Sequence, residues 1–583
     1  MSARVGLVVL GAIVLIAVVL HLPGLSSGLL ADDYLQRAML DGEYPVQRAP
    51  WNVYSFYGGA REHAELVASG TLPWWIPPEL RLSLLRPLPS LLLWLEHRLG
   101  LSLFARHLAS LGWLVAFLLA FHGLSRRVLP LAVALLATAL VAFDVALVSP
   151  VAWLCNRATL VSATFSALAL WAYHRDFEAA SPRWAWLSTL AFSLALLSGE
   201  YAVCALALVA AHELVAAGDA WSARLRRSAH AFVPAALYAL AHVAGGYGAS
   251  GGAIYVSPIE SPARFLAGAL VRVPSMLSTE LLLLPGEAVY VALVERSPLL
   301  VWAVVPLAVA MLVVGLGLAA LPSPFPRRFA AYALGVLLGL VPLSGTVPGV
   351  RLLLLTSVGG SLVLAATFWG VFQRVRSSPR RPTSWLLVLV AFPLVVLHLV
   401  LSPLVTRAES SAHRARTALL TRAALDSEID DSKVAGQDLV LLNLPADLVA
   451  VNYTVRVRHQ HGSPMPKSWR TLASAFVPLT VTRVADDALE LATASDADAF
   501  FNYEPRRAET PEKPFRAGQR ISVPGLELEI LEVRGWAPKR VRYRFPGGLD
   551  DPSRVFLRFE HGRLVRFAMP APGATAPLPV GFP

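Results

Sequence analysis

Charged residues are scarce in this sequence. Among its 583 residues, 15% are Asp, Glu, Lys or Arg, whereas 56% are hydrophobic, and the mean hydropathy is +0.57. A soluble globular chain of this length does not need such a balance. Long apolar runs, separated by Arg-rich or Pro-rich breaks, indicate instead a helical membrane protein that crosses the bilayer many times.

Cysteine and lysine are also rare. The two cysteines, Cys155 and Cys204, lie in or beside apolar segments, so they define neither a disulfide framework nor a zinc site. The formal charge of +11 comes almost entirely from arginine, a bias that suggests a GC-rich bacterial genome when Ala and Leu are abundant as well. In a membrane protein this charge is a topology signal, and no nucleic-acid partner is predicted. Lysine occurs only at Lys433, Lys467, Lys513 and Lys539.

Several motifs of soluble enzymes are missing. The sequence has no Walker A loop, no GxGxxG followed by a ribose-binding acid, no HExxH and no CxxC. The sequence therefore gives no support for a cytoplasmic domain that binds and hydrolyses nucleotides.

The apolar runs predict about eleven transmembrane helices, each of about 17–25 residues where the run is of full length. The run Pro87–Leu99 is apolar but too short to span, and we predict that it lies on the membrane surface as a juxtamembrane helix, as does Arg264–Leu284. The predicted spans fall near residues 5–22, 106–124, 129–148, 158–174, 200–216, 300–321, 329–346, 352–372 and 385–403, with shorter ones at 184–198 and 231–246.

The distribution of arginine between loops sets the predicted orientation. Arg126–Arg127, Arg327–Arg328 and the cluster Arg374–Arg381 fall in alternate loops, whereas the opposite short loops hold little beyond Arg157 and Arg351. By the positive-inside rule the Arg-rich loops are cytoplasmic. The chain is therefore predicted in the bacterial inner membrane, with an uncleaved first helix, a cytoplasmic N-terminus and an extracytoplasmic C-terminal domain.

The hydrophobic character stops near Thr406, so the chain divides there. Residues 1–405 form the predicted transmembrane domain, which includes an outer loop at 23–105; residues 406–425 form a linker and 426–583 a small soluble domain. Short alternating runs between Gly, Pro and Asp turns predict that this tail is mostly β. Its predicted strands are Asp438–Leu444, Ala450–Arg458, Phe476–Val484, Gly525–Val533, Arg540–Phe545 and Val555–Phe559.

Two adjacent acids, Asp32 and Asp33, follow the first apolar run almost at once. Carboxylates beside hydrocarbon are costly and usually functional. Such a group could act as general base toward a hydroxyl, or could help to hold a divalent metal. The alternative is a helix cap or an ordinary loop acid. We predict that the pair is catalytic, and the sequence leaves open both the metal and the choice between the two acids.

Four further residues are predicted to bind substrate: Arg86, Arg157, Glu200 and Arg351. Arg86 precedes Pro87, which can occupy the first position of a surface helix, and a helix N-terminus with a guanidinium suits a phosphate group. The other three lie at outer ends of apolar runs. Each has a structural alternative, because the arginines could contact lipid headgroups and Glu200 could pair with a cation such as Arg157.

In this order, these pieces resemble the C-fold membrane glycosyltransferases that use polyprenyl-phosphate sugars. The family includes protein O-mannosyltransferases, lipid A aminoarabinose transferases and tetratricopeptide-bearing mannosyltransferase-like proteins. The likeness covers about residues 1–405 and consists of short patterns. They are the acid pair, the Arg86-Pro87-Leu88 helix start, the outer loop Phe143–Ala158, the junction Ser198-Gly199-Glu200 and the helix start Arg351–Gly359.

The sequence also departs from that family. The acid pair is Asp-Asp where O-mannosyltransferases have Asp-Glu, Ala152 stands where an acid is common, and Ser198 stands where a basic residue is common. The second departure leaves a secondary acidic role unfilled. No tetratricopeptide repeats follow the spans, and the tail 426–583 resembles no family that we can name.

The resemblance implies an integral membrane glycosyltransferase that moves a sugar from a polyprenyl phosphate to an extracytoplasmic glycan, lipid or protein acceptor, surrounded by membrane lipids. Asp33 or Asp32 would take the acceptor proton, and Arg86 and Arg351 would neutralise the departing lipid phosphate. The alternative is a non-enzymatic transporter, flippase or cell-envelope assembly scaffold. Transporters often consist of two similar halves, which we do not see in this sequence.

Overall fold

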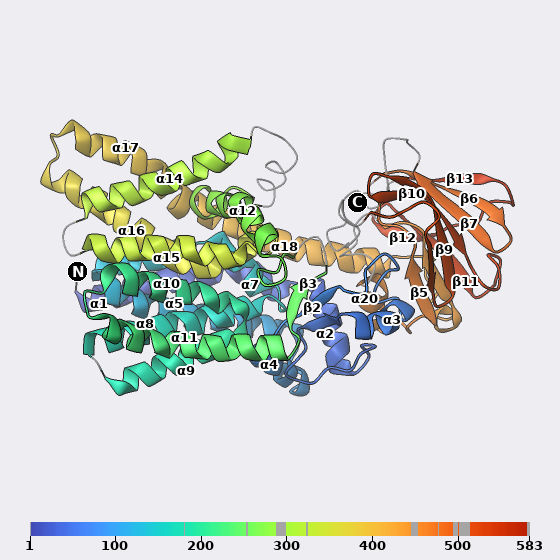
Figure 1. Ribbon diagram of the computed structural model, residues 1–583, viewed down its shortest axis with the longest axis horizontal. Helices are drawn as coiled ribbons and strands as arrows, with labels where there is room; N and C mark the ends of the chain where they lie inside the picture. The colour runs from blue at the N-terminus through green and yellow to red at the C-terminus, as the bar shows by residue number, and fades with distance from the viewer. Residues whose placement is uncertain are drawn as a thin grey trace.

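A bundle of helices forms one end of the elongated molecule and a β domain forms the other (Figure 1). The N-terminus lies at the end of the bundle away from the β domain. The computed structural model describes residues 2–179, 181–251, 255–286, 299–321, 325–444, 453–475, 477–493, 500 and 514–579.

Every predicted span falls on a helix or on consecutive helices of the bundle. Most of these helices are predominantly apolar, as expected where lipid replaces water. The helices are α1 (Ala3–His21), α5 (Leu103–Val128), α6 (Leu131–Ala142), α7 (Val148–Ala152), α8 (Arg157–Ala179), α9 (Pro182–Ser198), α10 (Val203–Ala211), α11 (Trp221–Ala244), α12 (Pro262–Leu282), α14 (Leu299–Ala320), α15 (Phe325–Leu343), α16 (Leu354–Ser377), α17 (Pro382–Val396) and α18 (Ser402–Leu425).

The predicted number of eleven spans is not confirmed. Within the described residues, five helical stretches are long and apolar enough to cross a membrane, and the pair α6–α7, bent by 54°, would make a sixth. Helices such as α9, with 17 residues, and α10, with 9, are shorter than a full span. By length and composition α12, which we predict on the membrane surface, belongs to the five.

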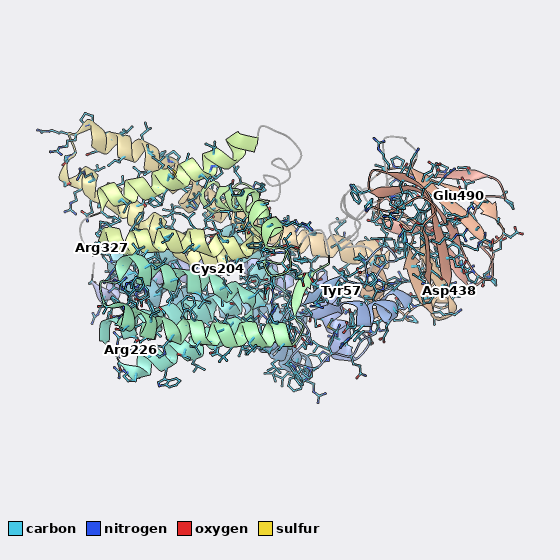
Figure 2. The ribbon with its side chains drawn as sticks, viewed as in Figure 1. Tyr57, Cys204, Arg226, Arg327, Asp438 and Glu490 are labelled. Atoms are coloured by element: carbon cyan, nitrogen blue, oxygen red, sulfur yellow. The ribbon has the colours of Figure 1, made fainter. Side chains whose placement is uncertain are left out.

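Two arginines that the sequence places in predicted cytoplasmic loops lie at the same end of the bundle: Arg226, from the cluster Arg224–Arg227, and Arg327. Figure 2 shows Arg226 and Arg327 at the end opposite the β domain, where the N-terminus also lies. This arrangement agrees with the alternation of loops that the sequence predicts. Which side of a membrane this end faces stays a prediction.

The outer loop folds between the bundle and the β domain. The 3-10 helix η1 (Leu22–Ser26) leads into α2 (Asp32–Asp41), which begins with the acid pair. Strand β2 (Arg81–Ser83) pairs with β1 (Ser55–Gly58) and with β3 (Gly248–Ser250) in an antiparallel sheet, so the later segment near residue 249 is tied to the loop. The loop also contains α3 (Ala60–Ala68) and α4 (Pro87–Arg98); α4 starts at Pro87, as predicted.

The tail is mostly β, as predicted. One sheet has six strands in the order β13-β6-β7-β10-β9-β8, and the other has four in the order β12-β11-β4-β5. Five of the six predicted strands fall on these strands. Their bounds are β4 (Asp438–Leu441), β5 (Ser468–Thr471), β6 (Leu479–Ala485), β7 (Ala488–Thr493), β8 (Arg520–Val523), β9 (Leu526–Arg534), β10 (Ala537–Arg544), β11 (Arg554–Glu560), β12 (Arg563–Arg566) and β13 (Thr575–Leu578).

The predicted strand Ala450–Arg458 is wrong. Residues 450–452 lie outside the described residues, and the rest forms helix α20 (Tyr453–Gln460). The alternation of Val455 and Val457 suggested a strand with one buried face. However, Arg458 is buried as well and donates to the carbonyls of Leu425 and Ile429. A helix covered on most of its surface therefore produced the misleading pattern.

The tail and the outer loop share one hydrophobic core. Trp74 of the loop packs against Phe515 and Tyr543 of the tail, and its indole N–H donates to the carbonyl of Leu472 at 3.0 Å. The segment 406–425, which we predict as a linker, forms most of α18 and runs as a helix from the bundle toward the tail (Figure 1). The β domain is therefore fixed to the loop that carries the acid pair.

Candidate active site

Asp33 is a buried carboxylate near the start of α2, with 4% of its surface exposed. It accepts hydrogen bonds from the backbone N–H of Leu30 at 3.0 Å and of Cys155 at 2.7 Å. Burial raises the pKa of Asp33 to about 7, although the two N–H donors oppose this rise. A carboxyl group with this pKa can take or give a proton near neutral pH. Asp32, beside it, is partly exposed.

The chain before the acid pair has an unusual backbone. Ala31 has φ of 50°, a region that residues with a Cβ seldom adopt, and it directly precedes α2. The preceding carbonyl, that of Leu30, accepts from the indole N–H of Trp153 at 3.0 Å. Strained backbone of this kind persists where surrounding contacts impose it, and it often occurs at functional sites.

The turn 153–156, between α7 and α8, connects the predicted site residues. Both backbone polar groups of Cys155 are hydrogen-bonded. Its N–H donates to Asp33, and its carbonyl accepts from the hydroxyl of Tyr54 at 2.8 Å. Tyr54 is 1% exposed, and burial raises its pKa well above the ordinary value, so it stays a donor. Its ring lies 5.3 Å from the guanidinium of Arg86. A continuous set of contacts thus joins Asp33 to Arg86.

Arg86 is buried and makes a forked ion pair with Glu200. Its Nε donates to one carboxylate oxygen at 3.0 Å and its Nη2 to the other, while Nη2 also donates to the hydroxyl of Tyr201 at 2.9 Å. Burial by itself would lower the pKa of Arg86, but the charge of Glu200 raises it well above the ordinary value. The guanidinium is therefore permanently charged. The Glu200 side chain remains 40% exposed.

Glu200 pairs with a cation, as its structural alternative states, but the cation is Arg86 and not the suggested Arg157. Arg157 is 3% exposed; it donates to Glu96 at 2.7 Å and to the carbonyl of Arg106 at 3.0 Å. These contacts join the first turn of α8 to α4 and α5. They give Arg157 a structural role next to the turn 153–156, and its predicted contact with substrate stays a prediction.

Arg351 is exposed at the outer end of α16, in the 3-10 helix η5 (Val350–Leu352). Its guanidinium lies 5.3 Å from the centre of the Trp153 ring. The structure therefore brings Asp33, Arg86 and Arg351 to one turn of the chain, from three distant segments. Sequence reasoning did not assign a role to Tyr54, Tyr201 or Glu96, because a single Tyr or Glu has no spacing that sets it apart.

The possible metal has no ready site among the described residues. No group of three or more His, Cys, Asp or Glu side chains in that part of the chain is placed to hold an ion. Both carboxylate oxygens of Asp33 already accept N–H groups.

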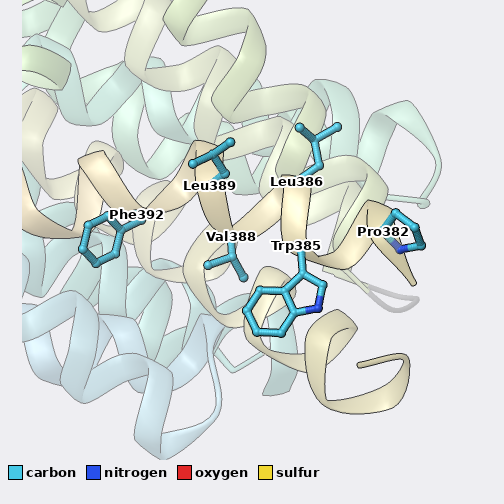
Figure 3. Close-up of a pocket in the computed structure, with 6 residues that line it drawn as sticks. All are labelled: Pro382, Trp385, Leu386, Val388, Leu389 and Phe392. Atoms are coloured by element: carbon cyan, nitrogen blue, oxygen red, sulfur yellow. The ribbon is translucent and has the colours of Figure 1, made fainter. Parts of the chain in front are cut away.

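A wide apolar depression of 710 Å³ lies elsewhere, along α17 (Figure 3). Its lining side chains, among them Trp385, Leu389 and Phe392, are strongly exposed and apolar. It contains none of the six predicted site residues. Such a surface is expected where a helix faces lipid.

No protein-family model matches this sequence, and no curated protein matches it. Solved structures similar to the chain include the oligosaccharyltransferase of Archaeoglobus fulgidus in its apo form, with a TM-score of 0.46 and 13% identity over 79% of this chain and 64% of that one. The same enzyme tethered to an acceptor peptide gives 0.44 and 13%, over 80% and 64%. This chain thus spans less than two thirds of the archaeal enzyme's length.

A further similar structure is ArnT from Cupriavidus metallidurans bound to undecaprenyl phosphate, with a TM-score of 0.40 and 12% identity over 81% of this chain and 90% of that one. Both enzymes are C-fold membrane glycosyltransferases, the group that the sequence motifs resemble. With TM-scores below 0.5, this likeness assigns no activity to the present chain.

Proposed function

We propose that this chain is an integral membrane glycosyltransferase that moves a sugar from a polyprenyl-phosphate donor to an extracytoplasmic acceptor. The observation that carries the proposal is Asp33, a buried carboxyl group with a pKa of about 7, held by two N–H groups. A general base is most effective when its pKa lies near the working pH. A carboxylate with an ordinary pKa of 3.8 would be a weaker base.

The proposed step is a displacement at the anomeric carbon of the donor sugar. A hydroxyl oxygen of the acceptor attacks this carbon and forms the new glycosidic bond. The bond between the carbon and the phosphate oxygen breaks, and its electron pair leaves with the phosphate. Asp33 accepts the hydroxyl proton. The products are the glycosylated acceptor and the polyprenyl phosphate, and the step needs no oxidant or nucleotide.

The two arginines oppose the charge that develops on the leaving phosphate, as fixed cations do in many active sites. Arg351 is exposed beside Trp153, so a phosphate can approach it directly. Arg86 is already paired with Glu200. We assign Glu200, whose side chain is 40% exposed, the role of a carboxylate that the donor phosphate replaces on Arg86. Arg157 acts indirectly, through the position of the turn 153–156.

The lipid part of the donor would lie beside α4. Leu91 and Leu95, four residues apart, share one side of α4, and Leu99 follows directly after the helix; they are 42%, 48% and 64% exposed. An exposed apolar stripe of this kind suits the membrane interface. It would hold Arg86, at the start of the same helix, at the level of the headgroups. We propose the eleven-span topology with this face outside.

The test is sugar transfer by the purified protein in nanodiscs. Synthetic polyprenyl-phosphate sugars would be offered with candidate acceptors, and released polyprenyl phosphate would be measured by mass spectrometry. Asp33→Asn should abolish most of the release. Glu178→Gln serves as control, because it removes a carboxylate from an exposed ion pair with Arg127 in another part of the chain. Equal release by wild type and Asp33→Asn would overturn the proposed role, and transport of a lipid without sugar transfer would favour the non-enzymatic alternative.

A further inference from the structure

A polar cavity of 440 Å³ lies between α2 and α20. Arg37 and Asp41 line it from α2, Glu43 from the chain just after that helix, and His459 and Gln460 from α20. The two helices are more than 400 residues apart in sequence but lie near each other where the bundle meets the β domain (Figure 1). The cavity therefore exists only when the tail is docked on the outer loop.

Ion pairs fix the polar groups of this cavity. Arg37 donates to Asp41 at 2.6 Å, and the imidazole of His459 lies 3.0 Å from the carboxylate of Glu43. The pairs hold donors and acceptors in a fixed arrangement. Glu43 and Arg37 still expose about 40% of their side chains, so they can exchange bound water for the polar groups of a ligand.

The lining residues favour a neutral ligand with many hydroxyl groups. A phosphate or other anion would have to displace the carboxylates of Asp41 and Glu43 from Arg37 and His459, which already hold them. A lipid chain needs apolar surface, and none of the five lining residues is apolar. An extended peptide usually adds to a free strand edge or places side chains in apolar pockets, whereas this cavity lies between two helices. Sugar hydroxyls, each both donor and acceptor, match alternating carboxylate, guanidinium, imidazole and amide groups.

The cavity is connected to the candidate active site by two helices. Helix α2 begins with the acid pair and ends at Asp41, and a helix rises 1.5 Å per residue, so Asp33 and Asp41 are about 12 Å apart along it. Helix α4 starts directly after Arg86, and near its other end His97 lies 3.5 Å from Asp41. The cavity and the acid pair therefore lie at opposite ends of α2, about 12 Å apart along the helix.

We propose that the cavity between α2 and α20 binds the glycan part of the acceptor, so that the acceptor is a saccharide chain. The name acceptor rests on the proposed function, whereas glycan binding itself does not. The tail then has a defined task, since α20 supplies one wall of the site.

The test is binding of the full-length protein in nanodiscs to an array of defined neutral oligosaccharides, with an array of Ser- and Thr-containing peptides beside it. We expect the wild type to bind at least one oligosaccharide. The double variant Glu43→Ala/His459→Ala should weaken that binding by at least about tenfold, the scale expected when hydrogen bonds to charged groups are lost. The control Glu529→Ala removes an acid from the exposed pair with Arg520 in the six-stranded sheet and should bind like wild type.

A measurement of the unfolding midpoint must accompany the arrays. If the double variant unfolds early, Gln460→Ala, which removes only an amide from the cavity wall, replaces it and should weaken binding in the same direction. Binding that is equal in wild type and cavity variants, or binding of peptides but of no oligosaccharide, would overturn the proposal. Intact glycan binding without sugar transfer from any lipid donor would instead count against the proposed function alone.

Discussion

The pH dependence of the reaction offers the sharpest test of Asp33. With a pKa of about 7, roughly a tenth of Asp33 is ionised at about pH 6 and nine tenths at about pH 8. If the ionised form is the base, kcat/KM of the wild type should rise about tenfold per pH unit below 7 and level off above it. The assay is sugar transfer in nanodiscs at a series of pH values, with a second buffer system as control.

Asp33→Asn should remove both the rate and its slope. The amide keeps the size of the side chain and can still accept one of the two N–H bonds, from Leu30 or Cys155. Loss of a general base lowers turnover by roughly two to four orders of magnitude. A variant that retained the wild-type slope below neutral pH would refute the reasoning, because some other group would then be titrating.

The same pKa predicts an effect on stability that does not depend on turnover. Since burial raises the pKa of Asp33 from 3.8 to about 7, the folded protein holds this proton more tightly than the unfolded chain does. The stabilisation is complete below the ordinary pKa and is lost as pH rises through 7, by about 1.4 kcal/mol per pH unit and about 4 kcal/mol in total. The unfolding midpoint of the wild type should therefore fall across this window more steeply than that of Asp33→Asn.

Four other predictions concern Arg86, Gly70, His459 and the topology. Arg86→Ala should weaken donor binding in nanodisc titrations by about 1.5–3 kcal/mol, and Arg86→Lys by less; three matching curves would remove Arg86 from the donor site. Gly70→Ala should destabilise the protein by roughly 2–5 kcal/mol in thermal unfolding, because its Cβ would lie 1.8 Å from Trp469. Gly518→Ala, with a similar φ of +81° and no atom within 4 Å of the new Cβ, should cost clearly less. Burial lowers the pKa of His459, but its hydrogen bond to Glu43 raises this pKa overall. The ion pair therefore stabilises the fold at low pH, by less than about 1 kcal/mol because both side chains are partly exposed, and this stabilisation is lost as pH rises through the pKa of His459. An NMR titration of His459 that is unchanged in Glu43→Gln would contradict this prediction. Ser377→Cys should be labelled from the cytoplasmic side and Ser432→Cys from the other, and labelling of both from one side would contradict the predicted topology.

Local features of this fold could be predicted from the sequence because their causes are local. Pro87 fixes the start of α4, since a proline needs no N–H partner there. Strand β6 follows its alternating apolar residues. The pattern failed at α20, where Val455 and Val457 are buried on different sides of a helix that is itself enclosed. The spacing of apolar residues indicates which residues are buried. It predicts a strand only when one face of the segment stays exposed to solvent.

The contacts of the site could not be predicted, because they join distant segments. Asp33 and Cys155 are 122 residues apart, and Arg86 and Glu200 are 114 apart. The types and positions of these residues pointed to the outer end of the bundle. Without the fold, however, the positions of these residues in the sequence could not show that Glu200 forms an ion pair with Arg86, or that Glu96 forms one with Arg157. The raised pKa of Asp33 has the same origin, since it depends on how the folded chain buries this side chain.

The common core of loop and tail has a consequence for biosynthesis. Residues near Trp74 are made early, whereas Leu472, Phe515 and Tyr543, which cover them, are made after the bundle helices. Domains generally fold as they emerge, beginning with the N-terminal part. Here the core of the loop stays incomplete, with its aromatic side chains uncovered, until the last part of the chain has been made. The order of translation thus delays completion of the loop core. A nascent chain truncated before the tail would expose an apolar, aromatic surface of the kind that chaperones bind.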